Sequence, residues 1–305
     1  MSDKRSSKLD ISALRVSRDY RFMFSASAIT GFGSMITAVA MPLQIAQLTG
    51  SYVAVGIVGI IQVIPLVVFG LWGGAIADSF NRKRVVIGCE VGLGISSLLL
   101  FVNALRPEPS LILIYVVAFC FSVFDGLQRP SIEALLPVLL PTDLLPSAGA
   151  LNGLKWNLTS IVGPAAGGVI AAVAGVQYCF GFDIASYVIS ALLLTRLSAK
   201  ANAHERKEIS LSFVFSGLGY AKTRPDLLGT YIVDIIAMVF AFPNALFPFI
   251  IEEFDAPWAL GLLYSSMSVG SLVATLFSGR AKHVRARGKL IIGAAALWGL
   301  AITAA

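Results

Sequence analysis

The ionisable residues that interrupt apolar stretches are the part of this sequence that could do chemistry. Asp125, Arg129 and Glu133 lie in an apolar run over 111–139 at spacings i, i+4 and i+8, which puts them on one helical face. In a membrane helix such a charge costs about 2.5–3.5 kcal/mol, so it usually faces a pathway or a partner. Asp125 is our first candidate for a proton or substrate site. A purely structural ladder of the three charges is the alternative.

Four other charges inside apolar runs are weaker signals. Lys155, Asp183 and Asp234 each lie about two helical turns inside their runs and are candidates for lining a cavity. Lys155 could equally extend its ammonium group along its apolar stem to a membrane surface. Glu90 lies close to the end of its run, so we assign it no special role. Among these residues Asp234 ranks next after Asp125.

The composition indicates which elements must position these charges. Of the 305 residues, 57% are hydrophobic and 13% are charged, a balance that soluble domains of this size do not show. We therefore expect an all-α polytopic membrane protein. Nine apolar runs have about the 20 residues that cross a bilayer, the last of them cut short: 22–48, 53–77, 85–105, 111–139, 148–174, 178–195, 227–251, 258–279 and 290–305.

The distribution of positive charge predicts the topology. When the nine runs are threaded alternately, twenty of the 23 Lys and Arg residues fall on the side of the N-terminus. Because cytoplasmic loops hold the excess of Lys and Arg, we predict a cytoplasmic N-terminus in a cell membrane protein. The opposite loops, such as 49–51 and 252–255, are short and neutral or acidic.

Several function classes are excluded by what the sequence lacks. The net charge of +6 is spread over short loops rather than gathered on one face, so we expect no nucleic-acid partner. Three unpaired cysteines and two loop histidines indicate neither disulfides nor a metal site. No nucleotide, zinc or hydrolase motif is present. We therefore expect neither an enzyme nor a cofactor, and an ion gradient, most plausibly of protons, as the energy source.

The turn between the second and third runs carries a recognisable motif. Residues 73–84, Gly-Gly-Ala-Ile-Ala-Asp-Ser-Phe-Asn-Arg-Lys-Arg, resemble the signature loop of the major facilitator superfamily, and Ser79 and Asn81 depart from its pattern. We call residues 73–84 the signature loop. A plain positive-inside loop is the alternative. The resemblance implies that the loop is a gate, formed here by Gly74, Asp78, Arg82, Lys83 and Arg84.

The fifth run carries a second motif. Gly163-Pro164-Ala165-Ala166-Gly167-Gly168 resembles the Gly-Pro-x-x-Gly-Gly motif of the antiporters of this superfamily. A proline inside a helix removes a hydrogen bond and bends it, and Gly163 and Gly167 allow a neighbouring helix to approach closely. The motif predicts a gate component, with ordinary helix packing as the alternative.

The superfamily resemblance implies two parallel six-helix halves. An internal repeat at an offset of 205 residues agrees, since Gly74 matches Gly279 and Arg82 matches Arg287. We predict an N-terminal half over 1–195, a cytoplasmic loop over 196–226 and a partial C-terminal half over 227–305. The chain looks truncated, because six-helix halves leave about three further helices unaccounted for. The resemblance also implies that Arg82 pairs with Glu133 and that Asp78 faces a helix missing from this chain.

The function follows from the same resemblance. The runs around Asp125-Gly126, 39–45 and 103–111 resemble the subfamily of enterobactin exporters and macrolide-efflux proteins. This implies a monomeric secondary transporter that exports a siderophore or an amphipathic drug-like small molecule across the lipid bilayer, by proton antiport. An importer of the same fold and an inactive fragment are the alternatives.

Overall fold

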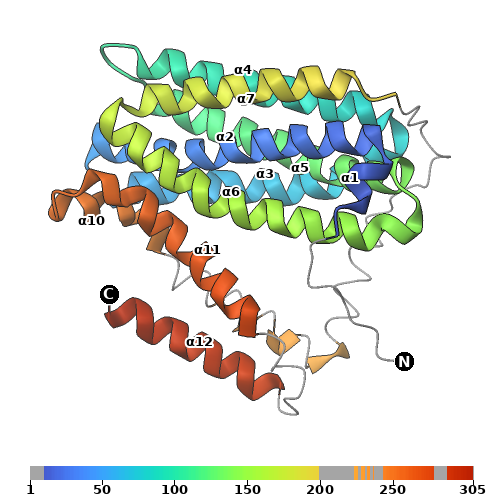
Figure 1. Ribbon diagram of the computed structural model, residues 1–305. Coiled ribbons are helices and arrows are strands. Elements are labelled where there is room, and N and C mark those ends of the chain that lie inside the picture. The colour runs from blue at the N-terminus through green and yellow to red at the C-terminus, as the bar shows by residue number, and fades with distance from the viewer. Residues whose placement is uncertain are drawn as a thin grey trace.

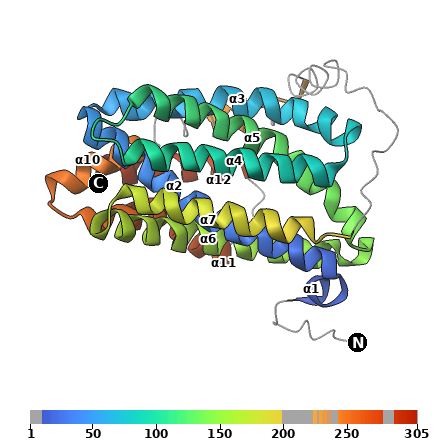
Figure 2. The same ribbon diagram turned by 90° about the horizontal axis from the view of Figure 1, so that it is seen from above.

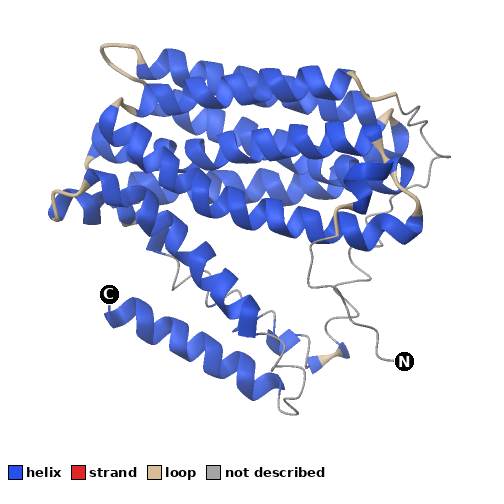
Figure 3. Ribbon diagram, viewed as in Figure 1, coloured by secondary structure: helices blue, strands red, loops and turns tan. Residues whose placement is uncertain are grey.

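The computed structural model of the protein describes residues 10–198, 223–225, 228–230, 232–233, 236, 243–277 and 287–304. In these residues it consists of helices joined by loops, without a strand (Figure 3). Its body is a bundle of six long helices that lie side by side (Figure 1): α2 (Arg18–Thr49), α3 (Tyr52–Ser79), α4 (Arg82–Ala104), α5 (Leu111–Leu139), α6 (Leu145–Val173) and α7 (Val176–Thr195). Their ends agree with the first six predicted runs to within four residues.

All six helices of the bundle contain a stretch long and apolar enough to cross a membrane. The prediction of an all-α polytopic protein is therefore confirmed. The division of the chain at residues 196 and 226 stays a prediction, because most of that loop lies outside the described residues.

Polar residues in the turns explain where the helices begin. Ser51 accepts a hydrogen bond from the Ala54 amide at 3.4 Å, and Ser110 accepts one from the Leu113 amide at 3.4 Å. Such side chains satisfy backbone donors that the first helical turn leaves unpaired. The turns after α2 and α6 contain Gly50 at φ 58° and Gly175 at φ 103°, backbone angles that favour glycine.

Helices α2, α4 and α7 each pack against two or more helices of the bundle. Helix α2 packs on α6 and α7, α4 packs on α5 and α7, and α3 packs on α5 (Figure 2). One apolar cluster includes Ile36, Ile114 and Phe180, and a second one includes Tyr20 and Leu194. The polar residues described below lie within this framework.

A short helix that the sequence did not predict precedes the bundle. In α1 (Ser12–Val16), Ala13 is fully buried, and the Ser147 hydroxyl donates to the backbone oxygen of Asp10 at 2.9 Å. Hydrogen bonds from the side chain and then the backbone of Ser12 lower the pKa of the Asp10 carboxyl. The residues just before α2 are thus tied to the start of α6.

The later part of the chain is described in pieces. The run predicted over 227–251 is continuously described only from Pro243, where a 3-10 turn (Pro243–Ala245) precedes α10 (Phe247–Glu253). After a second turn (Pro257–Ala259), α11 (Leu260–Phe277) packs on α6, and α12 (Arg287–Ala304) lies beyond α11 in Figure 1. These two helices occupy the eighth and ninth predicted runs.

Candidate functional site

The signature loop joins α3 to α4 and binds the ends of two other helices. Asn81 caps α4 by accepting a hydrogen bond from the Arg84 amide at 3.2 Å. The Arg82 guanidinium donates to the backbone oxygen of Ala134 on α5 at 3.1 Å. Lys83 donates to the backbone oxygens of Thr195 and Leu197 at 2.9 and 2.6 Å. The last contact suits a cation, because the C-terminus of a helix carries partial negative charge.

The residues of the signature loop differ in how far they are buried. Arg82 and Lys83 are half-buried, and Arg84 is exposed. Gly74 is also half-buried, while the side chain of Asp78 lies outside the described part of the structure. The hydrogen bond of Arg82 to Ala134 ends one residue beyond Glu133, the acid that the resemblance assigns to it.

A close contact between α3 and α5 lies beside this loop and was not predicted. A Cβ at Gly73 would meet the backbone oxygen of Gly126 at 2.7 Å, and one at Gly126 would meet the amide nitrogen of Gly70 at 2.9 Å. Three glycines therefore let the two backbones touch. The only signal in the sequence was the presence of glycine in both runs, which does not say which glycines face each other.

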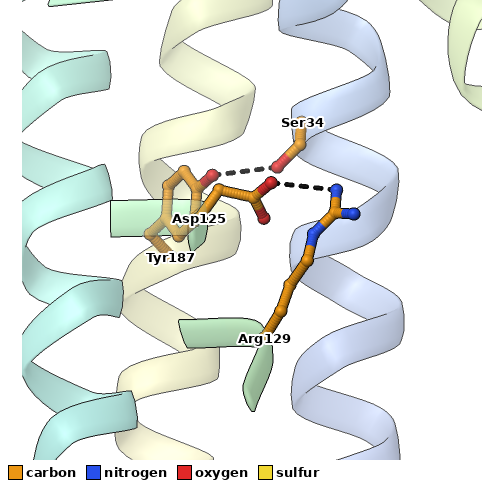
Figure 4. A network of polar contacts seen from close by, with 4 residues as sticks. All are labelled: Ser34, Asp125, Arg129 and Tyr187. Atoms are coloured by element: carbon orange, nitrogen blue, oxygen red, sulfur yellow. Dashed lines mark hydrogen bonds and ion pairs between the residues drawn. The ribbon is translucent and has the colours of Figure 1, made fainter. Parts of the chain in front are cut away.

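The charges of α5 divide into a pair and a separate acid. Arg129 Nη2 lies 2.9 Å from Asp125 Oδ2, and the side chains are 60% and 39% exposed (Figure 4). Figure 4 also shows the hydrogen bond of 2.9 Å between the hydroxyls of Ser34 on α2 and Tyr187 on α7. One turn beyond Arg129, Glu133 is exposed and lines a crevice that also contains Lys155.

Lys155 points into the protein. Its ammonium group donates to the Ser27 hydroxyl of α2 at 2.7 Å and lies 5.8 Å from the centre of the Phe24 ring. The crevice has a volume of about 70 Å³, enough for a few water molecules, and lies between α2, α5 and α6. Of the two predicted placements for Lys155, the inward one therefore agrees with the structure.

Asp183 lies in the packed interior rather than on a cavity wall. Its side chain is fully buried, and three hydroxyls donate to it: Thr37 at 2.8 Å and Ser97 at 2.7 Å to Oδ2, and Ser186 at 3.3 Å to Oδ1. A Cβ at Gly33 of α2 would lie 2.6 Å from Oδ1. Asp183 thus connects α7 to α2 and α4.

Glu90 is the residue that the sequence interpretation undervalued. It is only 3% exposed, and Gln128 of α5 donates to its Oε1 at 2.9 Å. The prediction that it needs no special role, because it lies near the end of its run, is corrected by this burial. The available signal was its spacing with Gly94 and Ser97, which puts all three on one face of α4.

The antiporter motif, residues 163–168, packs α6 against helices on two sides. A Cβ at Gly163 would lie 2.5 Å from Met35 Cβ, and one at Gly167 would lie 3.1 Å from Ile36 Cα, both on α2. On the other side, Gly168 meets Gly261 of α11, and Pro164 is buried inside the helix. Close packing is thus observed, and a gating role stays a prediction. Asp234, the second-ranked candidate, lies outside the described residues.

Comparison with known proteins places this arrangement among transporters. The model of the family described as transmembrane secretion effector matches residues 11–305. The enterobactin exporter of Shigella boydii serotype 18 is 28% identical over 291 residues, which cover 95% of this chain and 70% of that protein. The enterobactin exporters of Escherichia coli O139:H28 and O9:H4 match with the same identity and coverage.

Proposed function

We propose that this chain, which belongs to the transmembrane secretion effector family of the major facilitator superfamily, exports a siderophore or another amphipathic compound by proton antiport. Its family, its exporter relatives and its six apolar helices support a multi-pass membrane transporter. The observation that carries the proposed cargo is the similarity to enterobactin exporters over 95% of the chain.

The Asp125–Arg129 pair supports the proposed coupling to protons. Both side chains are partly open, and they pair within one helix at 2.9 Å. Protonation of Asp125 would remove its negative charge and release the guanidinium of Arg129. A free guanidinium can then bind carboxylate or phenolate oxygens of a cargo. Asp125 would thereby exchange a proton for the cargo as the site alternates between the two sides of the membrane.

The signature loop supports the proposed alternation. Through Arg82 and Lys83 it joins the α3–α4 turn to α5 and to the end of α7. Breaking these polar contacts would let the ends of the helices separate, while the glycines at residues 163–168 keep α6 against α2. We further propose that this end of the bundle faces the cytoplasm of the cell, since it carries the positive turns, and that the protein acts as a monomer with no partner besides its cargo and the lipid.

An efflux assay tests the proposal. The chain, expressed to the stop codon of its gene in a host without its own exporters, is loaded with enterobactin or erythromycin. We expect energy-dependent efflux that stops when a protonophore is added. Asp125→Asn should lower the rate by about tenfold or more, as a barrier raised by roughly 1.4 kcal/mol would. Glu108→Gln, an exposed acid in the α4–α5 loop, is the matched control.

Each arm of the assay can contradict one part of the proposal. Efflux that persists without a proton gradient would overturn antiport. Full activity in Asp125→Asn would remove Asp125 from the mechanism. No efflux of either compound by the unmutated protein, at confirmed expression, would overturn the proposed cargo class.

A further inference from the structure

A line of contacts runs between α4 and α7. The two helices are antiparallel neighbours. Each presents three positions at helical spacing to the other: Glu90, Gly94 and Ser97 on α4, and Asp183, Tyr187 and Ser190 on α7. Ser97 bonds Asp183 at 2.7 Å, and a Cβ at Gly94 would lie 3.2 Å from Tyr187 Cβ. Glu90 and Ser190 follow at the end nearer the signature loop.

The two carboxyl groups on this line have very different partners. Asp183 Oδ2 accepts hydrogen bonds from Thr37 and Ser97, and Oδ1 shares the Ser186 hydroxyl with the Asp183 backbone oxygen. Glu90 receives one, from Gln128 to Oε1, and its Oε2 has no hydrogen-bond partner although the residue is 97% buried (3% exposed). The Ser190 hydroxyl is fully buried beside the Glu90 carboxyl and is the polar group next to it on α7, although the two do not reach hydrogen-bond geometry in this conformation.

A proton is the ligand that fits the buried Oε2 atom of Glu90. A bare, buried carboxylate oxygen is costly, because it loses its hydration and gains no donor in return. One proton on Oε2 removes the charge and creates a donor next to Ser190. A metal cation would need several oxygen ligands, whereas the Gln128 amide already presents an N–H group to Oε1.

The ionisable groups around Glu90 add to this preference. Those that interact with it are Asp183 and Tyr187 on α7 and its neighbour Cys89 on α4. Two of the cations near Glu90 in the sequence of α4 and α5 have other partners. Arg129, which follows Gln128 on α5, pairs with Asp125, and Lys83 binds the end of α7. Carboxylates close to one another disfavour a further negative charge.

We propose that Glu90 is a second proton-binding residue of this transporter, outside the Asp125–Arg129 pair; this inference rests on the proton antiport proposed above. In the conformation described here Oε2 carries the proton. During the cycle the O–H bond breaks, its electron pair stays on Oε2, and the proton leaves through water to the cytoplasm. Lys83, at the cytoplasmic end of α4 in the proposed orientation, lies about 10 Å away along the helix.

Infrared spectroscopy of the purified full-length gene product in an ester-free detergent tests the site without any cargo. We expect a C=O stretching band of a protonated carboxyl group that disappears on titration to high pH. Glu90→Gln keeps the shape of the side chain and should remove the band, whereas Glu108→Gln and Asp183→Asn should retain it. A band that survives in Glu90→Gln, or no band in the unmutated protein, overturns the proposal. A band that shifts when sodium replaces choline would favour a cation instead and also overturn it.

A transport measurement in proteoliposomes separates this inference from the proposed function. With enterobactin as the probe, Glu90→Gln should lower uptake driven by an imposed pH gradient by about tenfold or more. Exchange of labelled for unlabelled enterobactin, which needs no net proton movement, should continue. Gradient-driven uptake at the full rate in Glu90→Gln overturns a role for Glu90 in coupling. If the unmutated protein ignores the gradient, proton antiport itself fails, while the infrared band still decides whether Glu90 holds a proton.

Discussion

Asp183 and Asp125 are two aspartates of the bundle whose surroundings are opposite. Asp183 is fully buried and accepts hydrogen bonds from hydroxyls on α2, α4 and its own helix. Asp125 is 39% exposed and pairs with Arg129, four residues further along the same helix. In the part of the chain that the structure describes, the first residue joins three helices, whereas the second pairs with a side chain on its own helix.

This difference indicates which acid can change state at low cost. Removing one member of a buried polar network leaves the others unsatisfied and is strongly destabilising. An exposed pair within one helix contributes little to stability, because water replaces each partner. We therefore regard Asp183 as a fixed connection and Asp125 as a group free to gain a proton or lose its partner. The predictions below test this contrast through stability, in order of decreasing effect.

The largest loss of stability is expected for Asp183→Ala. The buried hydroxyls of Thr37 and Ser97 lose their acceptor and a small cavity forms, which we expect to cost about 3 kcal/mol, or roughly 6–12 °C in the unfolding midpoint. Labelling of the buried thiols of Cys89 and Cys179 with a thiol-reactive dye during heating measures it. Asp183→Asn, which keeps the size and acceptor oxygen, should lose less. A midpoint for Asp183→Ala equal to that of the unmutated protein would remove Asp183 from the set of structural residues.

An intermediate loss is expected for Gly33→Ala. The added Cβ would lie 2.6 Å from Asp183 Oδ1 and 2.9 Å from Ser186 Cβ, so α2 must move away from α7. Overpacking of this kind costs about 1–3 kcal/mol. Gly31→Ala, two residues earlier on α2, is the matched control, because its Cβ would meet only Thr159, at 3.6 Å. The same thermal assay should separate the two variants; equal midpoints would show that the Asp183 site is loosely packed.

The bounds of the helices could be predicted from the sequence, because the length of each apolar run and the polar residues between runs determine where a membrane helix begins and ends. Ser51 and Ser110 begin α3 and α5 where an apolar run resumes, and Gly50 ends α2. The short α1 was not predicted because five residues carry too little periodicity. Pro243 lies in the 3-10 turn before α10, and Pro248 lies in the first turn of α10, where a missing amide proton costs no hydrogen bond.

The inward-facing side chains were harder to predict because the lipid is as apolar as the protein interior. In a soluble helix the apolar face identifies the core, but here Ile95 on α4 faces outward while Glu90 is buried on the same helix. The pairing of Asp125 with Arg129 followed from their i, i+4 spacing in the sequence. The hydroxyls that surround Asp183 come from α2 and α4, about 150 and 90 residues away, and nothing local in the sequence indicates such a meeting.

The smallest effect is expected for Asp125→Asn, the variant that the transport assay predicts to be most impaired. An exposed i, i+4 pair contributes about 0.3–0.5 kcal/mol, which shifts the unfolding midpoint by roughly 1–2 °C at most. Arg129→Gln should behave in the same way, and the double variant should lose no more than either single one to within about 0.5 kcal/mol, because each single variant already breaks the pair. Loss of transport without loss of stability would separate Asp125 from Asp183. If heating instead exposes the buried thiols of Asp125→Asn as early as those of Asp183→Ala, then Asp125 is a structural residue too, and its loss of transport says nothing about protons.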